Sequence, residues 1–156
     1  MPKITPCLWF DGKAEEAMNF YRSIFPDTEI LSVMRTSAAG PGPEGSVLAV
    51  TFRLQGQEIM GLNGGPYFSF TPAMSFFVTC DTQAEVDSFW EKLLEGGKPS
   101  QCGWLTDKYG LSWQIVPKRL GELQQDPDRA KAARVVQAML KMVKLDIAGL
   151  ERAAAG

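Results

Sequence analysis

The same order of secondary-structure elements is predicted twice along this chain, and this repeat constrains the fold more than any other feature. Each half begins with a strand, continues with an amphipathic helix and ends with a group of strands. Laying the second half over the first aligns the two helical regions and matches Asp11 with Asp81, Ala14 with Ala84, Glu15 with Glu85, Phe20 with Trp90 and Ile24 with Leu94. The repeat predicts two modules of the same topology.

Periodicity places the elements of both modules. In the first half, a helix is predicted at residues 13–25 and strands at 4–10, 28–35, 46–54 and 58–62. In the second half, strands are predicted at 73–80, 99–105 and 111–116. Thr82 and Glu85 form a capping-box pattern at the start of the second helix, which ends at Gly96.

A tail of different character follows Pro117. Asp126 and Pro127 are typical of a helix N-cap followed by a first-turn proline. One or two helices are predicted from an apolar stripe of Val135, Met139, Met142, Val143 and Leu150. We expect the tail to pack on its own domain or on a dimer mate, with a surface for another partner as the alternative. The expected organisation is a first module at 1–66, a second at 67–118 and a helical extension at 119–156 within one compact domain.

Composition limits the chemistry and the partners. The chain has no histidine, which removes the commonest general base and the commonest transition-metal ligand. The formal net charge is −2 and the basic residues are scattered, so neither nucleic acid nor an anionic membrane is expected as a partner. Cys7, Cys80 and Cys102 contain no C-x-x-C pair and fit reduced thiols. No signal segment or apolar run long enough to span a bilayer is evident, so we expect a cytoplasmic protein.

Several motifs resemble one known family. They are residues 4–10, Glu16-Ala17 with Phe20-Tyr21 and Phe25-Pro26, the block from Cys102-Gly103-Trp104 to Trp113-Gln114 and Pro117, and Ala138-Met139 with Met142 and Lys144-Leu145-Asp146. Together they resemble the glyoxalase-like, PhnB-like branch of the vicinal oxygen chelate superfamily, a branch often labelled 3-demethylubiquinone-9 3-methyltransferase. The resemblance implies an α+β fold of two βαβββ modules (glyoxalase/bleomycin-resistance-like), a cavity enclosed by their sheets, and a homodimer.

The resemblance also implies where a metal would bind. Metal-dependent members use four positions, which correspond here to Thr5, Met60, Ser75 and Gln114, or to Pro6 in place of Thr5 if the register slips by one. None of these side chains carries a charge, and replacing the hydration shell of a divalent cation requires strongly donating ligands. We therefore expect no tightly bound metal, and we predict no cofactor. The amide of Gln114 either satisfies buried neighbouring groups or contacts a ligand.

Strand parity predicts a ligand-binding face. Ser75, Phe77 and Thr79 lie opposite Phe76, Val78 and Cys80, and Gln114 lies opposite Trp113 and Ile115. The alternative is a solvated or dimer-facing sheet surface, with the aromatic residues packed in the core or at its rim. Cys102 is either a nucleophile or an inert buried thiol. The candidate pocket residues are Thr5, Trp9, Met60, Ser75, Phe77, Trp104 and Gln114.

These observations favour a protein that binds a small molecule in a pocket between its modules without a tight metal, and they leave open whether it is an enzyme. One alternative is a metal-dependent lyase or dioxygenase-type enzyme of the same fold. Another is a methyltransferase, for which Asn63-Gly64-Gly65-Pro66 is the only glycine-rich turn and lacks the usual spacing. A structural or interaction module that uses the methionine-rich tail is the fourth hypothesis.

Overall fold

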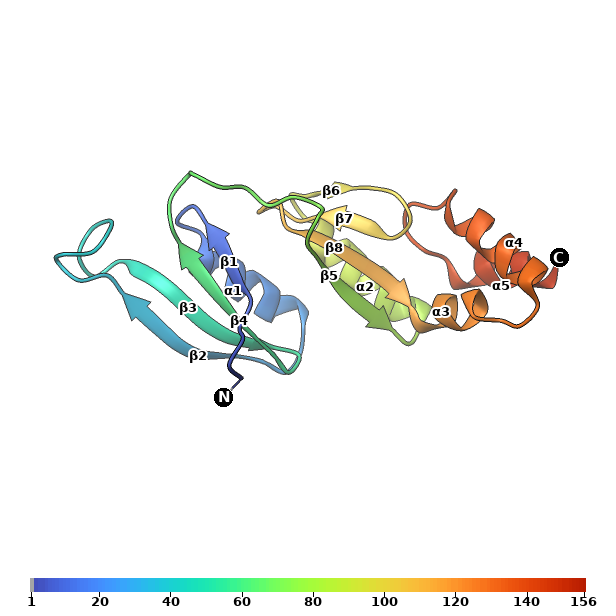
Figure 1. Ribbon diagram of the computed structural model, residues 1–156, viewed down its shortest axis with the longest axis horizontal. Coiled ribbons are helices and arrows are strands. Elements are labelled where there is room, and N and C mark those ends of the chain that lie inside the picture. Colours follow the sequence, from blue (N-terminus) through green and yellow to red (C-terminus); the bar gives the residue numbers. More distant parts are fainter. Residues whose placement is uncertain (1) are drawn as a thin grey trace. The chain divides into compact units, whose positions relative to one another are not determined.

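The computed structural model describes residues 2–156, which form two compact units, one ending at Phe70 and the other spanning Thr71–Gly156 (Figure 1). Each unit contains one four-stranded sheet, covered by one helix in the first unit and accompanied by four helices in the second. The predicted pair of βαβββ modules with a C-terminal helical region is confirmed. Among the described helices, none combines the length and the apolar character that crossing a bilayer requires.

The first unit is a mixed sheet covered by one helix. Its elements are β1 (Cys7–Phe10), α1 (Ala14–Ile24), β2 (Thr28–Arg35), β3 (Val47–Leu54) and β4 (Gln57–Asn63), and the strand order is β1-β4-β3-β2. β1 runs parallel to β4, and the other pairs are antiparallel. The helix buries Met18 and Tyr21, and Phe52 and Ile59 are buried in the sheet. Gly61 allows a close approach, since a Cβ there would lie 3.2 Å from the Cβ of Ala14.

The second unit repeats this arrangement. Its module contains β5 (Ser75–Cys80), α2 (Gln83–Leu94), β6 (Lys98–Pro99), β7 (Trp104–Thr106) and β8 (Ser112–Pro117), in the strand order β5-β8-β7-β6. The registers match as well, because Cys7 pairs with Met60 in the first sheet and Phe77 pairs with Gln114 in the second. Cys7 and Phe77 are separated along the chain by the same offset as Asp11 and Asp81, so the structural repeat follows the sequence repeat.

Two strand predictions differ most from the structure. The first strand begins at Cys7 rather than at residue 4, and the strand predicted at 99–105 is two short strands, β6 and β7. The interruption has a backbone cause, because Cys102 (φ 58°) and Gly103 (φ 85°) both adopt left-handed conformations that a strand cannot contain.

Helix capping follows the prediction in one place and departs from it in two. The Thr82 hydroxyl accepts a hydrogen bond from the Glu85 N–H at 3.2 Å, but the Glu85 carboxylate accepts from the N–H of Asp81 rather than from that of Thr82. The cap predicted at Asp126 was wrong. Asp128 caps α4 (Arg129–Met139) by accepting two backbone N–H bonds at 3.1 and 3.2 Å. Asp126 instead accepts from the N–H of Asp128 at 2.9 Å.

The extension beyond β8 contains three helices, one more than the largest number predicted. They are α3 (Lys118–Gln124), α4 and α5 (Ile147–Ala155). Of the predicted stripe, Val135 and Leu150 are fully buried and Val143 is 42% exposed, while Met139 and Met142 pack at the edge of the cluster. The core cluster joins the extension to the end of β8 and consists of Val116, Leu120, Leu123, Val135, Leu145, Leu150 and Ala154. The extension therefore packs on its own unit.

Candidate functional site

One face of the second sheet gathers the candidate residues of that unit. Gln114 on β8 pairs with Phe77 on parallel β5 and with Trp104 on antiparallel β7. Residues paired across neighbouring strands project from the same face of a sheet, so these three side chains are neighbours. The opposite face packs toward α2, and there Phe76 and Trp113 form an edge-to-face pair with ring centroids 5.1 Å apart. The parity predicted from the sequence is therefore correct.

A pocket of about 390 Å³ lies between this face and the helical extension. Its volume falls within the range of about 300 to 1,000 Å³ that is typical of small-molecule sites. The lining residues come from the sheet, from the loop before β7 and from the extension: Phe77, Thr79, Cys102, Trp104, Gln114, Val116, Pro117, Lys118, Leu120, Gly121, Gln124 and Met139. The pocket predicted between the two halves stays a prediction.

The Gln114 amide is held by Ser75. Its Nε2 donates a hydrogen bond to the Ser75 Oγ at 3.0 Å, and both side chains are partly buried. Within residues 2–156, no protein group donates a hydrogen bond to the Gln114 Oε1. One half of the amide is therefore satisfied by the hydroxyl of Ser75, while the other half can accept a hydrogen bond from a bound molecule.

Cys102 forms part of the pocket wall and is only partly buried. Its backbone N–H donates to the carbonyl of Met142 at 2.8 Å, which fixes the turn to the extension. Cys80 differs, because it is fully buried on β5, and burial together with Glu85 and Asp81 raises the pKa of its thiol to about 12. The environment of Cys102 is thus accessible, and that of Cys80 is not.

The remaining predicted residues, Thr5, Trp9 and Met60, lie in the first unit. Met60 pairs with Cys7 as Gln114 pairs with Phe77, so Thr5 and Met60 occupy positions equivalent to Ser75 and Gln114. Trp9 forms contacts within its own unit. Its Nε1 donates to the Gly65 carbonyl at 2.8 Å, and its ring meets that of Phe68 edge-to-face at 4.9 Å.

Sequence reasoning missed the pocket residues of the extension, which are Lys118, Leu120, Gly121, Gln124 and Met139. A signal was present, since Lys118, Gly121 and Gln124 recur at every third position and therefore share one face of α3. Met139 was assigned to an apolar stripe but not to a pocket.

Comparison with known proteins identifies the family. A family model described as 3-demethylubiquinone-9 3-methyltransferase matches residues 2–116. The chain belongs to this family. A PhnB protein from Bacillus cereus is 47% identical, with a TM-score of 0.68, and the match covers 74% of this chain and 99% of that chain. A search of curated proteins finds no match.

Two more distant structures share the fold alone. A glyoxylase/bleomycin resistance protein/dioxygenase domain from Frankia is 13% identical, with a TM-score of 0.50 and coverage of 74% of this chain and 92% of that chain. A mutant of the fosfomycin resistance protein FosX from Listeria monocytogenes, complexed with Mn(II), is 15% identical, with a TM-score of 0.54 and coverage of 72% and 90%. These similarities establish the glyoxalase/bleomycin-resistance-like architecture.

The residues at the four positions that the family resemblance assigns to a metal do not fit a divalent cation. Thr5, Met60, Ser75 and Gln114 offer two hydroxyls, a thioether and an amide, and none of them carries a charge. Among residues 2–156, no group of three or more Asp, Glu, Cys or His side chains is arranged to hold a metal ion. Hard cations such as Mg²⁺ and Mn²⁺ favour carboxylate oxygens, and softer ones favour imidazole or thiolate.

The family description implies S-adenosylmethionine, and the glycine-rich turn does not fit that cofactor. In nucleotide-type sites the glycines let the backbone approach the ligand at the start of a helix. Here the Trp9 ring lies against Gly64, where an added Cβ would overlap the ring carbons. The next element after this turn is strand β5 rather than a helix. Gly64 therefore accommodates Trp9.

Proposed function

We propose that this protein binds a small organic molecule in the pocket between one face of its second sheet and the helical extension, and does so without a tightly bound divalent metal. The observation that carries the proposal is the pocket around Gln114. Its walls are largely apolar and aromatic, and a few polar groups converge in it, as is typical of small-molecule sites.

Gln114 is the proposed polar contact. Ser75 restrains the amide nitrogen, so the amide oxygen can accept a hydrogen bond from a ligand without first being ordered. Trp104 and Phe77 flank it on the neighbouring strands, and Phe77 is 59% exposed. An exposed phenylalanine ring beside an amide supplies both apolar contact and orientation for a flat or branched ligand.

We propose metal-free binding because the neutral side chains of Thr5, Met60, Ser75 and Gln114 cannot replace the hydration shell of a divalent cation. Removing an ion from water costs several kcal/mol even after the protein relaxes, on the order of the whole stability of a domain. Neutral hydroxyl, thioether and amide groups return only part of that energy. The fold shared with FosX does not bear on this point, because a shared fold does not by itself supply metal ligands.

Two measurements test the proposal. Elemental analysis of protein purified without chelators should find no stoichiometric Mn, Fe, Ni or Zn. A thermal-shift screen should show stabilisation by some of a panel of small aromatic and aliphatic compounds (benzoate, benzamide, phenol, hexanoate), since a ligand of the native state raises the melting temperature. Neither Mn²⁺ nor S-adenosylmethionine should shift it.

A matched pair of variants locates the site. Gln114→Ala should weaken binding by about 2- to 10-fold, the effect of about 0.5 to 1.5 kcal/mol from one hydrogen bond. Gln101→Ala removes an exposed glutamine outside the pocket and should leave binding unchanged. Stoichiometric metal that Gln114→Ala abolishes would replace the proposal with a metal-dependent enzyme. A shift with S-adenosylmethionine would favour the methyltransferase.

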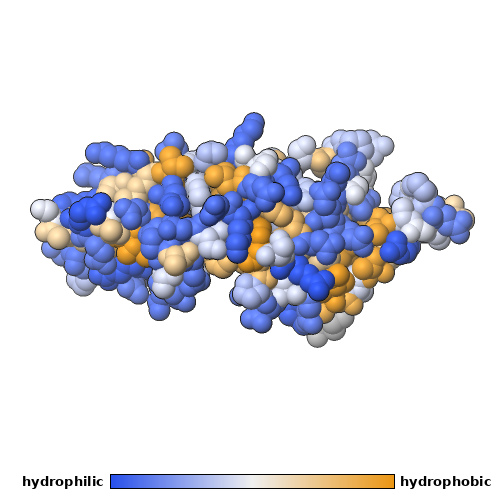
Figure 2. Space-filling model, turned by 180° about the vertical axis from the view of Figure 1, so that it is seen from behind, coloured by the Kyte–Doolittle hydropathy of each residue, from blue (hydrophilic) through white to orange (hydrophobic). Residues whose placement is uncertain are grey.

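The proposal includes a homodimer in the cytoplasm. Strand β2 lies at the edge of its sheet and carries exposed apolar side chains, including Met34 at 58% and Ile30 at 38% exposure. Figure 2 shows hydrophobic surface on the first unit, whereas the C-terminal extension is mainly hydrophilic on the face shown. Exposed apolar surface of this kind is typical of association sites. Light scattering should give twice the chain mass, and cell fractionation tests the location.

A further inference from the structure

The C-terminal extension contributes five of the twelve residues that line the pocket: Lys118, Leu120, Gly121, Gln124 and Met139. The family model ends at residue 116, so these five residues, and Pro117 at the end of β8, lie beyond it. The pocket in its present form is therefore a property of this chain's extension as well as of the shared module.

This wall is attached to the module by buried contacts and by hydrogen bonds. The N–H groups of Cys102 and Gly103 donate to the carbonyls of Met142 and Val143 at 2.8 and 2.7 Å. On the other side, the Gln83 side chain bridges the extension by donating to the Leu145 carbonyl at 3.0 Å and accepting from the Ile147 N–H at 2.8 Å. A wall held in this way is preorganised, which lowers the cost of binding.

The pocket residues of the module and those of the extension differ in charge. The module contributes no charged residue to the pocket, and the extension contributes one, Lys118. No carboxylate lines the pocket, although the chain as a whole carries a net charge of −2. Across residues 2–156, no carboxylate lies within ion-pair distance of the Lys118 ammonium.

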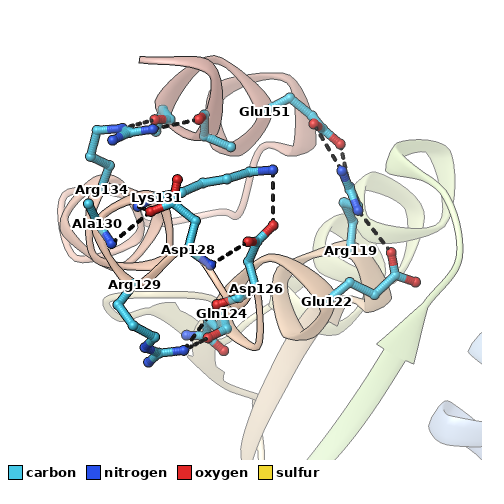
Figure 3. Close-up of polar contacts among 12 residues, drawn as sticks. Arg119, Glu122, Gln124, Asp126, Asp128, Arg129, Ala130, Lys131, Arg134 and Glu151 are labelled. Atoms are coloured by element: carbon cyan, nitrogen blue, oxygen red, sulfur yellow. Dashed lines mark hydrogen bonds and ion pairs between the residues drawn. The ribbon is translucent and has the colours of Figure 1, made fainter.

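Three other cationic side chains of the extension form ion pairs or hydrogen bonds within the protein. Arg119 pairs with Glu122 and Glu151, and Lys131 pairs with Asp126 at 3.0 Å. Arg134 donates to two carbonyls at the end of α5, at 2.8 and 3.0 Å (Figure 3). Among the described residues, Lys118 is thus the single cation that lines the pocket, and its charge is available to a ligand.

We propose that the pocket selects a small organic anion, with its apolar body against Trp104, Leu120 and Met139 and its anionic group at Lys118. This inference rests on the proposed function and specifies its ligand class. A charge-assisted hydrogen bond is stronger than a neutral one, but Lys118 is exposed, and exposed ion pairs contribute less. Together these effects predict a preference for the anion of about 3- to 10-fold that falls with added salt.

The test uses matched acid and amide probes on the whole chain. Cys7→Ser removes the exposed thiol and Cys80 is buried, so Cys102 becomes the reporter in the pocket wall. Benzoate, phenylacetate and hexanoate are compared with the corresponding amides by calorimetry and by protection of Cys102 from iodoacetamide, which is itself neutral. We expect the acids to bind more tightly than the amides and to protect Cys102.

Variants of the lysine separate charge from packing. Lys118→Met should reduce the affinity for the acids to that for the amides and leave the amides unaffected, and Lys118→Arg should retain the preference. Lys141→Met is the control, because Lys141 is an exposed lysine of the same extension outside the pocket. Circular dichroism and the melting temperature confirm that each variant is folded.

The outcomes distinguish this inference from the proposed function. Equal binding of acids and amides, or unchanged acid binding by Lys118→Met, overturns the selection of an anion and leaves small-molecule binding in place. If no probe binds or protects Cys102, both proposals fail.

Discussion

Asp107 does not line the pocket, but its loss should strongly destabilise the strand that carries Gln114. It is a carboxylate only 3% exposed, directly after β7 in the turn that leads to β8. Its Oδ1 accepts from the N–H groups of Tyr109 at 2.8 Å and Leu111 at 3.0 Å, and its Oδ2 accepts from the indole N–H of Trp113 at 2.9 Å. One side chain thereby closes the turn and fastens it to the strand that carries Gln114.

The size of the effect follows from these bonds. Asp107→Ala leaves three donors without their acceptor, of which the Leu111 N–H and the Trp113 indole belong to residues that are at most 1% exposed. A buried donor left unsatisfied costs about 1 to 3 kcal/mol, and removing the desolvated carboxylate offsets part of the sum. We expect a net loss of about 3 to 4 kcal/mol, a large fraction of the about 5 to 15 kcal/mol that stabilises a typical domain.

Urea denaturation followed by circular dichroism measures the loss. Asp107→Asn conserves size but presents an amide N–H₂ where one oxygen accepted, so it should cost nearly as much as alanine if hydrogen bonding is the cause. Trp113→Phe removes the indole donor, and the double-mutant cycle with Asp107→Ala should give a coupling of about 1 to 2 kcal/mol. Asp81→Ala is the control, since Asp81 is exposed, and it should stay within about 0.5 kcal/mol of the wild type. A loss below about 1 kcal/mol for Asp107→Ala, or a coupling near zero, would refute the reasoning.

The other predictions concern backbone, capping and titration. Gly103→Ala should destabilise the protein by about 2 kcal/mol or more, because φ is 85° and the new Cβ would lie 2.9 Å from Leu145. Gly12 has φ 73° and open space around it, so Gly12→Ala should cost only about 1 kcal/mol. Denaturant titrations measure both losses. Thr82→Ala removes the N-cap of α2 and should cost about 1 kcal/mol, while Thr82→Ser should restore most of it. The pKa of Cys80 is raised from 9.0 to about 12, so its stabilising contribution is complete below pH 9 and is lost as the pH rises toward 12. Cys80→Ala should flatten the fall in stability over that range, and an unchanged slope would contradict the assignment.

Features set by local sequence could be predicted from the chain alone. The helix at α1 depends on the helical period and the faces of β5 and β8 depend on strand alternation, and both are properties of short segments. The internal repeat predicted the module topology, and the matching registers of the two sheets agree with it. The neutrality of those positions could also be predicted, because side-chain chemistry does not depend on the fold.

Contacts between distant segments were decided only by the tertiary structure. The turn at Cys102 and Gly103 is held by the carbonyls of Met142 and Val143, and the Gln83 side chain binds the backbone of Leu145 and Ile147. The pocket needs Lys118 and Gln124 on a helix packed against Trp104 and Gln114 on a sheet. Sequence periodicity tells which face a residue occupies, but which faces meet is set by burial of the whole apolar cluster, and that is a property of the packed chain.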